Sequence, residues 1–279
     1  MVKYARGRIL ILGALVGFAT CVPSAQTSEP AYLGFDRNTY PGDANLRALR
    51  QTFSYTGYWL NNPPGEKVNS WKGHRAVVEA AGFGFLVLFN GRLYAELKSV
   101  ANATRLGRSD ARAAVDAARH EGFPAHTIIF LDQEQGGRML AEQKAYIYSW
   151  VDAVTAAGFR AGIYCSGVPA ADDGNIVTAE DIRANAGTRQ ITFWAINDAC
   201  PPSPGCAFHG YPPTPAQSGV AFAEVWQFAQ SPQRVEVAGR CAGYSRDANC
   251  YPPGVDPTQG LYIDVNTATS SDPSHGRSQ

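Results

Sequence analysis

The chain has 279 residues, of which 45% are hydrophobic and 17% are charged, and its formal net charge is +0. This composition is typical of a globular protein with a large core, and it excludes a chain that is disordered throughout. The sequence has no basic stripe, so nucleic acid is not an expected partner, and electrostatic binding to an anionic membrane has no support.

Residues 1–25 are predicted to be a secretory signal peptide. Basic residues precede a short apolar run from Ile9 to Thr20, and small residues follow up to Ala25. The run is shorter than the roughly 20 residues of a membrane span. Cleavage after Ala25 would give a secreted or periplasmic protein with no stable membrane span. Lipidation of Cys21 is the less favoured alternative, because Phe-Ala-Thr is a poor approach to a lipoprotein cysteine.

Apolar, β-branched or aromatic runs alternate with helical patterns along the rest of the chain. The predicted strands are 31–36, 53–60, 83–90, 127–132, 161–165, 191–196, 223–228 and 261–265. Helical patterns start after 41–43 and cover 71–81, 109–121, 139–157 and 178–186, with Ser109 and Thr178 as candidate N-caps.

Alternation of strands and helices predicts parallel strands, and the apolar strands predict burial on both faces. Eight such units favour a single (β/α)₈ TIM barrel over residues 30–267, followed by a disordered polar tail at 268–279. An open doubly wound sheet is the alternative, but no Gly-x-Gly-x-x-Gly follows the first strand.

The cysteines of an exported chain are expected to form disulfides. Cys200 with Cys206 and Cys241 with Cys250 are close in sequence within segments rich in Gly and Pro, which predicts two local loop disulfides. Cys165 lies in an apolar run and is predicted to be a buried free thiol. The spacing of the thiols is a poor match to a zinc site, for which only His209 lies close.

Four acids fall at the predicted strand ends. Asp36 ends the first strand, Asp132 and Glu134 end the fourth, and Asp264 ends the eighth. The carboxyl ends of barrel strands meet at one face, and alternation along a strand points Asp132 and Glu134 the same way. The four carboxyl groups are therefore predicted to share one pocket.

Crowded carboxylates repel one another, so at least one should keep its proton near neutral pH. Hydrolysis of a glycosidic bond needs such an acid beside an ionised carboxylate. Two other interpretations remain open: helix capping or ion pairs with Arg37, Arg92 or Arg138, and a site for a divalent metal.

Aromatic and amide side chains on the later strands are candidates for sugar binding, by ring stacking and by hydrogen bonds to hydroxyl groups. They are Tyr58, Tyr164, Trp194, Asn197, Trp226 and Gln227. Core packing is the alternative for each aromatic ring. The sequence has no Gly-x-Ser-x-Gly or His-Glu-x-x-His motif, and no cofactor is expected.

These strand ends resemble a known family. Gly34-Phe35-Asp36, Leu131-Asp132-Gln133-Glu134, Trp226-Gln227-Phe228 and Tyr262-Ile263-Asp264-Val265-Asn266 are similar to the strand-end signature of glycoside hydrolase family 25 lysozymes. The segment Tyr55–Leu60 and the order of elements resemble a sister group more closely. That group is a bacterial glycoside-hydrolase-like TIM-barrel domain of unknown function, often exported.

The resemblance implies a role for each acid. Glu134 matches the proposed general acid of the family, Asp132 its partner on the same strand, and Asp36 and Asp264 the acids of the first and last strands. Family 25 enzymes cleave the muramic acid to glucosamine link of peptidoglycan. The third strand departs from the family, because residues 88–92 lack the frequent Tyr-His-Phe.

The expected function is therefore an exported glycoside-hydrolase-like protein that hydrolyses a glycosidic bond in peptidoglycan or another polysaccharide by carboxylate acid/base catalysis. Two alternatives remain. One is a glycan-binding module on the same barrel that does not cleave, and the other is a metal-dependent hydrolase of another class.

Overall fold

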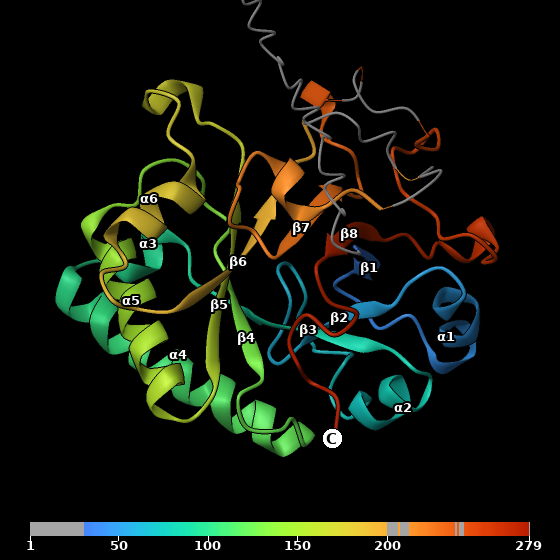
Figure 1. Ribbon diagram of the computed structural model, residues 1–279, viewed down its shortest axis with the longest axis horizontal. Helices are drawn as coiled ribbons and strands as arrows, with labels where there is room; N and C mark the ends of the chain where they lie inside the picture. The colour runs from blue at the N-terminus through green and yellow to red at the C-terminus, as the bar shows by residue number, and fades with distance from the viewer. Residues whose placement is uncertain (1–30, 200–205, 207–211, 238, 240–242, 279) are drawn as a thin grey trace, which may run out of the picture.

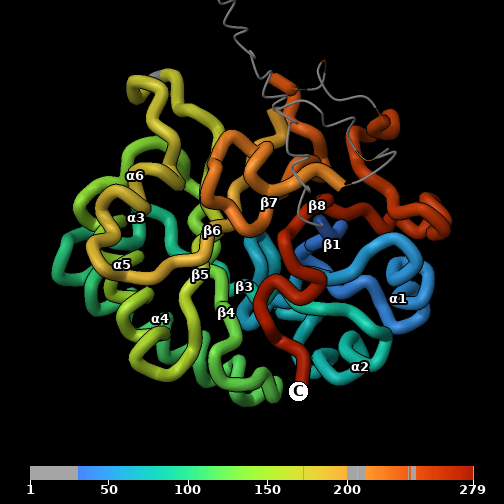
Figure 2. The backbone as a smooth tube through the Cα atoms, viewed as in Figure 1, coloured from blue at the N-terminus to red at the C-terminus, as the bar shows by residue number. Residues whose placement is uncertain are grey.

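The computed structural model describes residues 31–199, 206, 212–237, 239 and 243–278. Eight strands form one closed barrel in chain order (Figures 1 and 2). They are β1 (Tyr32–Asp36), β2 (Tyr55–Trp59), β3 (Gly84–Asn90), β4 (Ile128–Asp132), β5 (Arg160–Ser166), β6 (Ile191–Ile196), β7 (Val225–Ala229) and β8 (Asp264–Ala268). The prediction of a single TIM-like barrel is confirmed.

The last strand differs from the prediction. Strands β1 to β7 pair in parallel, but β8 is antiparallel to both β7 and β1. Asp264 was expected to end the eighth strand, and it is instead the first residue of β8. Because β8 is reversed, its first residue still lies at the barrel end where the other strands finish, and Asp264 pairs directly with Asp36.

Six α-helices lie outside the barrel in the described residues, α3 to α6 on one side and α1 and α2 on the other (Figure 1). They are α1 (Asp43–Arg50), α2 (Arg75–Ala80), α3 (Tyr94–Leu97), α4 (Val100–Glu121), α5 (Ala141–Ala156) and α6 (Thr178–Asn185). No α-helix follows β6 or β7 in the described residues, so the strict (β/α)₈ alternation stops there.

Two predicted N-caps are wrong. Helix α4 begins earlier than predicted, and its cap is Ser99, whose hydroxyl accepts a hydrogen bond from the Asn102 N–H. Ser109 therefore lies in the middle of α4. Val177 occupies the N-cap position of α6, and the Thr178 hydroxyl donates instead to the Gly137 carbonyl.

Helices α4 and α5 pack directly against each other at Gly107. A Cβ at that position would lie 2.2 Å from the Ser149 Oγ and 2.3 Å from the Tyr146 carbonyl oxygen. Only glycine allows this close approach, although glycine is otherwise unfavourable in the middle of a helix.

The predicted disordered tail is ordered through Ser278. Asp272 and Ser274 accept hydrogen bonds from the N–H groups of Phe85 and Val87, and the Ser274 carbonyl accepts one from Ile128. The segment therefore satisfies backbone groups near the starts of β3 and β4, at the barrel end opposite the acids. The tail looked disordered because its bonds are made by short polar side chains, which carry no hydrophobic pattern.

The disulfide prediction is wrong in its pairing. Cys206 is bonded to Cys250, 44 residues further along the chain, with the Cα atoms 5.2 Å apart. Cys250 is buried, and its N–H donates to the Ser231 hydroxyl at 2.8 Å. Sequence proximity favoured local pairs, but the fold brings these two long loops together. Cys165 is a buried free thiol, as predicted.

Several predictions fall outside the described residues: the signal peptide with Cys21, and the positions Cys200, Cys241 and His209. Among the residues that the structure does describe, no helix has the length and apolar character that crossing a membrane requires.

Candidate active site

The fold brings the four predicted acids together at one end of the barrel. Asp36 and Asp132 are the last residues of β1 and β4, Glu134 lies just beyond β4, and Asp264 begins the reversed β8. Asp36 and Asp132 are buried and Asp264 is half-buried, whereas Glu134 is exposed. One accessible carboxyl group is thus backed by three less accessible ones.

Asp36 lies at the centre of a network of buried amides. Its Oδ1 accepts hydrogen bonds from Gln227 Nε2 at 3.0 Å and from Asn266 Nδ2 at 2.7 Å. The Tyr164 hydroxyl donates to the Gln227 oxygen at 2.8 Å, and the Trp194 indole donates to the Asn266 oxygen at 3.1 Å. Because each amide oxygen already accepts a bond, each amide N–H is directed at Asp36.

Gln227 also links the network to β8. Its Nε2 lies 3.5 Å from the Asp264 Oδ2, while the other oxygen of Asp264 accepts a hydrogen bond from the Ser231 N–H. Asp36 and Asp264 are therefore held side by side by the same amide and by the strand register.

Asp132 and Glu134 form the second half of the cluster. Their carboxyl groups interact: the interaction with Glu134 raises the pKa of Asp132, and the interaction with Asp132 lowers that of Glu134. Asp132 Oδ1 is buried and has no hydrogen-bond partner in the described part of the chain. Gln133, between them in sequence, turns aside and donates to the Gln135 carbonyl. The predicted two-residue alternation therefore holds beyond the strand end.

The pKa of every acid in the cluster is raised, mainly by loss of solvent, and the charges of neighbouring acids add to this for Asp36, Asp132 and Asp264. Burial raises the pKa of Asp36 to about 6, although its amide hydrogen bonds oppose this. Burial, the charge of Glu134 and the shared hydrogen bond raise the pKa of Asp132 well above its usual value. Loss of solvent raises the pKa of Glu134, and burial followed by the charge of Asp36 raises that of Asp264. The cluster therefore retains protons at a pH where isolated carboxyls are ionised.

The three arginines that were alternative ion-pair partners of these acids make other contacts. Arg92 pairs with Asp110 at 2.6 Å and with Glu96, and Arg138 lies 3.9 Å from Asp173. The Arg37 guanidinium lies over the ring of Tyr262. In the described residues, no three or more His, Cys, Asp or Glu side chains are grouped so that they could hold a metal ion.

The predicted sugar-binding residues divide into two groups. Tyr164 and Gln227 contact the acid network inside the barrel. Trp194 is also inside, but it is 1% exposed and packs against Tyr164 at 4.6 Å, so its ring has no free face for a sugar. Sugar stacking by Trp194 is therefore a wrong prediction.

The remaining three candidates lie away from the acids. Tyr58 is fully buried, and its hydroxyl donates to Glu121 at the end of α4. Trp226 is also fully buried and donates to the Asn197 carbonyl, while the Asn197 amide donates to Ser218. Alternation explains the error for Trp226, because Gln227 faces the barrel interior and its neighbour must face outward.

Other residues, not identified from the sequence, line two grooves at this end of the barrel. A groove of about 460 Å³ begins at Gln135, next to Glu134, and is lined by Tyr94 and Leu140. A second groove, of about 260 Å³, includes Asp264 and Tyr262. Tyr94, Leu140 and Tyr262 are 40%, 47% and 40% exposed, so they can contact a ligand where the buried tryptophans cannot. The first two follow β3 and β4, where barrel loops form sites, and that rule could have identified them.

Residues 72–203 match the family model described as Rv2525c-like, glycoside hydrolase-like domain. The resemblance inferred from the motifs is thereby confirmed. A comparison with curated proteins found no match.

Solved structures share the fold. An uncharacterized protein from B. stearothermophilus is 20% identical, with a TM-score of 0.53 over 85% of this chain and 95% of that one. The spore cortex lytic enzyme SleM of Clostridium perfringens is 15% identical, with a TM-score of 0.51 over 86% and 68%. A family 25 glycosyl hydrolase from Bacillus anthracis is 10% identical, with a TM-score of 0.50 over 86% and 89%.

Proposed function

We propose that this protein hydrolyses a glycosidic bond in peptidoglycan or another polysaccharide, with Glu134, Asp132, Asp36 and Asp264 as its catalytic groups. The observation that carries the proposal is the carboxyl cluster at the barrel mouth, where the pKa of all four acids is raised. Gathering buried acids is unfavourable for folding, and perturbed pKa values of this kind are typical of catalytic sites.

Glu134 is the proposed general acid. It is the exposed member of the cluster, its pKa is raised, and a groove begins at the next residue. Asp132 is the buried carboxyl group beside it, and the interaction with Glu134 raises the pKa of Asp132. Desolvation raises the pKa of Glu134 although its hydrogen bond with Asp132 opposes this, which supports delivery of a proton from Glu134 to the leaving oxygen, with Asp132 orienting the Glu134 carboxyl group.

Asp264 and Asp36 have separate proposed roles. Asp264 lines the second groove, where its carboxylate can stabilise positive charge on the sugar ring or orient the substrate. Asp36 lies deeper, fixed by two amides, and acts through its charge, which raises the pKa of Asp132 and Asp264. Tyr94, Leu140 and Tyr262 offer exposed apolar surface for sugar rings.

Two observations support a cell-wall substrate outside the cytoplasm. Among the proteins of similar fold, one is described as a spore cortex lytic enzyme and another as a family 25 glycosyl hydrolase. The predicted signal peptide and the Cys206–Cys250 disulfide both favour an oxidising compartment, in which such a bond forms and persists.

The test is incubation of the purified protein with peptidoglycan and a panel of polysaccharides, followed by mass spectrometry of the released fragments. Glu134→Gln removes the proton donor and is expected to reduce cleavage about a hundredfold or more. Glu224→Gln is the matched control, because Glu224 is an exposed glutamate that immediately precedes β7, at the opposite end of the barrel. The control should cleave like the parent.

Equal cleavage by Glu134→Gln and the parent would contradict the assigned roles. If the parent binds a glycan in a pull-down but releases no fragment from any substrate, the protein is a glycan-binding module and the proposal of hydrolysis fails.

A further inference from the structure

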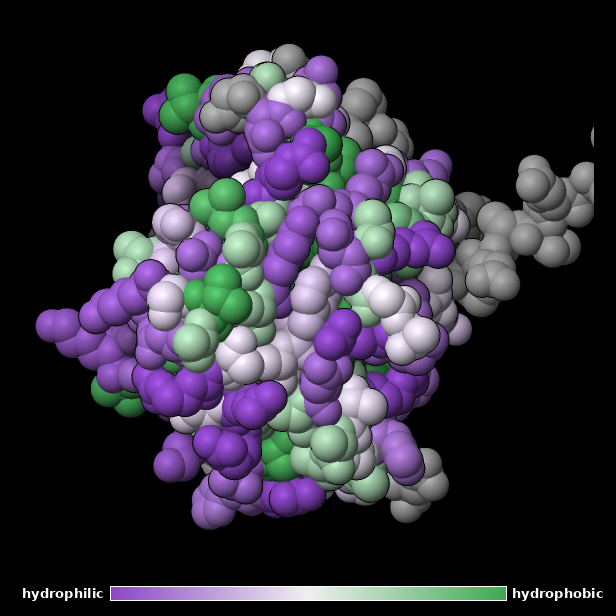
Figure 3. Space-filling view, turned by 90° about the vertical axis from the view of Figure 1, so that its left-hand side faces the viewer, coloured by the Kyte–Doolittle hydropathy of each residue, from purple (hydrophilic) through white to green (hydrophobic). Residues whose placement is uncertain are grey.

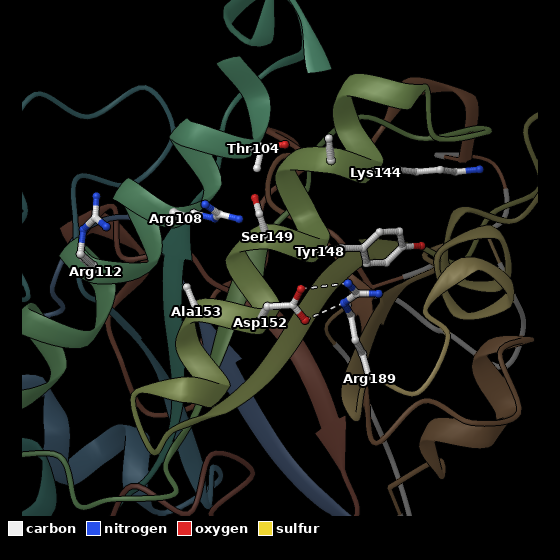
Figure 4. Close-up of a pocket in the computed structure, with 10 residues that line it drawn as sticks. Thr104, Arg108, Arg112, Lys144, Tyr148, Ser149, Asp152, Ala153 and Arg189 are labelled. Carbon is white, nitrogen blue, oxygen red and sulfur yellow. Dashed lines mark hydrogen bonds and ion pairs between the residues drawn. The ribbon is translucent and has the colours of Figure 1, made fainter. Parts of the chain in front are cut away.

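A third groove, distinct from the two at the barrel mouth, lies outside the barrel between α4 and α5 (Figure 4). Its volume is about 530 Å³. Arg108 and Arg112 line it from α4, and Lys144 and Asp152 line it from α5. Arg189, just before β6, completes the set, so four cationic side chains face a single carboxylate.

The charge of two of these cations is not neutralised. Asp152 accepts two hydrogen bonds from Arg189, at 2.7 and 2.8 Å, and Lys144 lies 3.4 Å from Asp181. Arg108 and Arg112 are exposed, and neither has an ion-pair partner among the described residues. In Figure 4 the Arg108 side chain extends from α4 toward Ser149 on α5. The groove is therefore a site of net positive charge.

Hydroxyl groups in the groove can only accept hydrogen bonds from a ligand. The hydroxyls of Thr104, Ser149 and Tyr148 already donate to the carbonyls of Val100, Tyr146 and Ile182. Each hydroxyl has one hydrogen, so only its oxygen lone pairs remain. The groove thus presents guanidinium donors for anionic groups beside acceptors for hydroxyl donors.

The two helices that form the groove are held together, and most of the side chains that line it carry a polar or charged group. The contact at Gly107 holds α4 and α5 in direct contact where the groove forms. The exposed large hydrophobic side chains of the described residues do not line it. The face that carries α3 to α6 is mainly hydrophilic, with apolar groups scattered over it (Figure 3). A membrane surface, which would favour apolar insertion, fits this face poorly.

We infer that the groove between α4 and α5 binds an anionic polymer rich in hydroxyl groups, of the polyol phosphate class. Arg108 and Arg112 bind its phosphates, since a planar guanidinium matches the paired oxygens of a phosphate. The oxygens of Ser149, Thr104 and Tyr148 accept from its hydroxyls. The site is separate from the carboxyl cluster and does not depend on hydrolysis.

The experiment measures binding of fluorescently labelled poly(glycerol phosphate) to the full chain by anisotropy, at several salt concentrations. The parent should bind saturably and more weakly as salt rises, because binding releases counterions. Arg108→Gln/Arg112→Gln should weaken binding at least about tenfold and make the salt dependence shallower.

The control has the same change in net charge. Arg47→Gln/Arg246→Gln removes two exposed arginines that form no ion pair with the described residues, one on α1 and one in the loop between β7 and β8, and should bind like the parent. An equal loss in this control would show attraction to net charge alone and overturn the inference. Equal binding of neutral dextran, or binding of phosphatidylglycerol vesicles without binding of the polymer, would overturn it as well.

Discussion

Asp36 is a buried carboxyl group whose ionised form is stabilised by hydrogen bonds from two amides. Gln227 and Asn266 both donate hydrogen bonds to its Oδ1. The hydrogen bonds favour the ionised form, while burial and the neighbouring charge of Glu134 oppose it, and burial is the largest effect on the pKa. The folded protein therefore binds this proton more tightly than the unfolded chain does.

Asp36→Asn should stabilise the protein at neutral pH. The pKa rises from 3.8 to about 6 on folding, so ionisation of Asp36 lowers the free energy of unfolding as pH rises from 4 to 6. Asparagine keeps an oxygen for both amides and carries no charge. We expect a gain of up to about 3 kcal/mol at pH 7 that vanishes below pH 4, measured by urea unfolding.

Asp116→Asn, an exposed position on α4, is the control and should change stability little at either pH. A gain for Asp36→Asn that is the same at pH 4 and pH 7 would contradict the electrostatic explanation.

At the scale of elements, α4 and α5 pack directly against each other at Gly107, where helix propensity and packing predict opposite effects of a substitution by alanine. In an exposed helix, Gly→Ala stabilises by about 1 kcal/mol. Here the added methyl group would overlap Ser149 and the Tyr146 carbonyl, and backbone cannot move aside without separating the helices.

Gly107→Ala should therefore destabilise the protein, by roughly 1–3 kcal/mol, as overpacking in a well-packed contact does. Urea denaturation measures the free energy of unfolding. Ala113→Gly, at an exposed position of the same helix, gives the propensity effect alone and should cost about 1 kcal/mol. Stabilisation by Gly107→Ala would show that the helices can separate freely.

The C-terminal segment acts as part of the barrel. Ser274 is fully buried, and its hydroxyl accepts a hydrogen bond from the Val87 N–H at 2.8 Å. Ser274→Ala leaves that N–H without a partner and should lower stability by about 1–3 kcal/mol in thermal or urea unfolding. Ser278→Ala, at an exposed serine of the same segment, should have a much smaller effect. Equal effects would contradict a specific role for the Ser274 bond.

At the scale of the whole molecule, the disulfide joins the loop after β6 to the loop after β7. Cys206 and Cys250 are 44 residues apart, and β7 lies between them. A cross-link over that length restricts the unfolded chain more than either predicted local bond would have done by itself.

Replacement of both cysteines, Cys206→Ser/Cys250→Ser, should lower the free energy of unfolding by up to about 4 kcal/mol, the chain-entropy value for a loop of this length. Thermal unfolding measures the change, and reductant should affect the parent but leave the double variant unaffected. Cys165→Ser is the control for thiol chemistry elsewhere. Non-reducing peptide mapping that finds Cys206 bonded to another cysteine would contradict the pairing.

The sequence by itself determined the strand count, the barrel and the gathering of the acids. Continuous apolar runs between helical patterns identify strands, because a strand that is buried on both faces needs apolar residues at nearly every position. Asp36, Asp132 and Glu134 could be placed because parallel strands end at one face, and that is a rule of topology. The direction of β8 could not be predicted, since the hydrophobic pattern of a strand is the same whether the strand is parallel or antiparallel to its neighbours. Asp264 lies at the predicted end of the barrel because it begins β8, where it was predicted to end it, and β8 runs in the opposite direction.

Only the tertiary structure decided what depends on contacts between distant residues. The partner of Cys206, the order of the C-terminal segment and the burial of Tyr58, Trp194 and Trp226 follow from which surfaces meet. The exposed residues at the barrel mouth and the basic groove between α4 and α5 depend on loop paths and helix packing in the same way. The sequence pattern records whether a side chain is apolar, and the packed fold decides which face of it remains accessible.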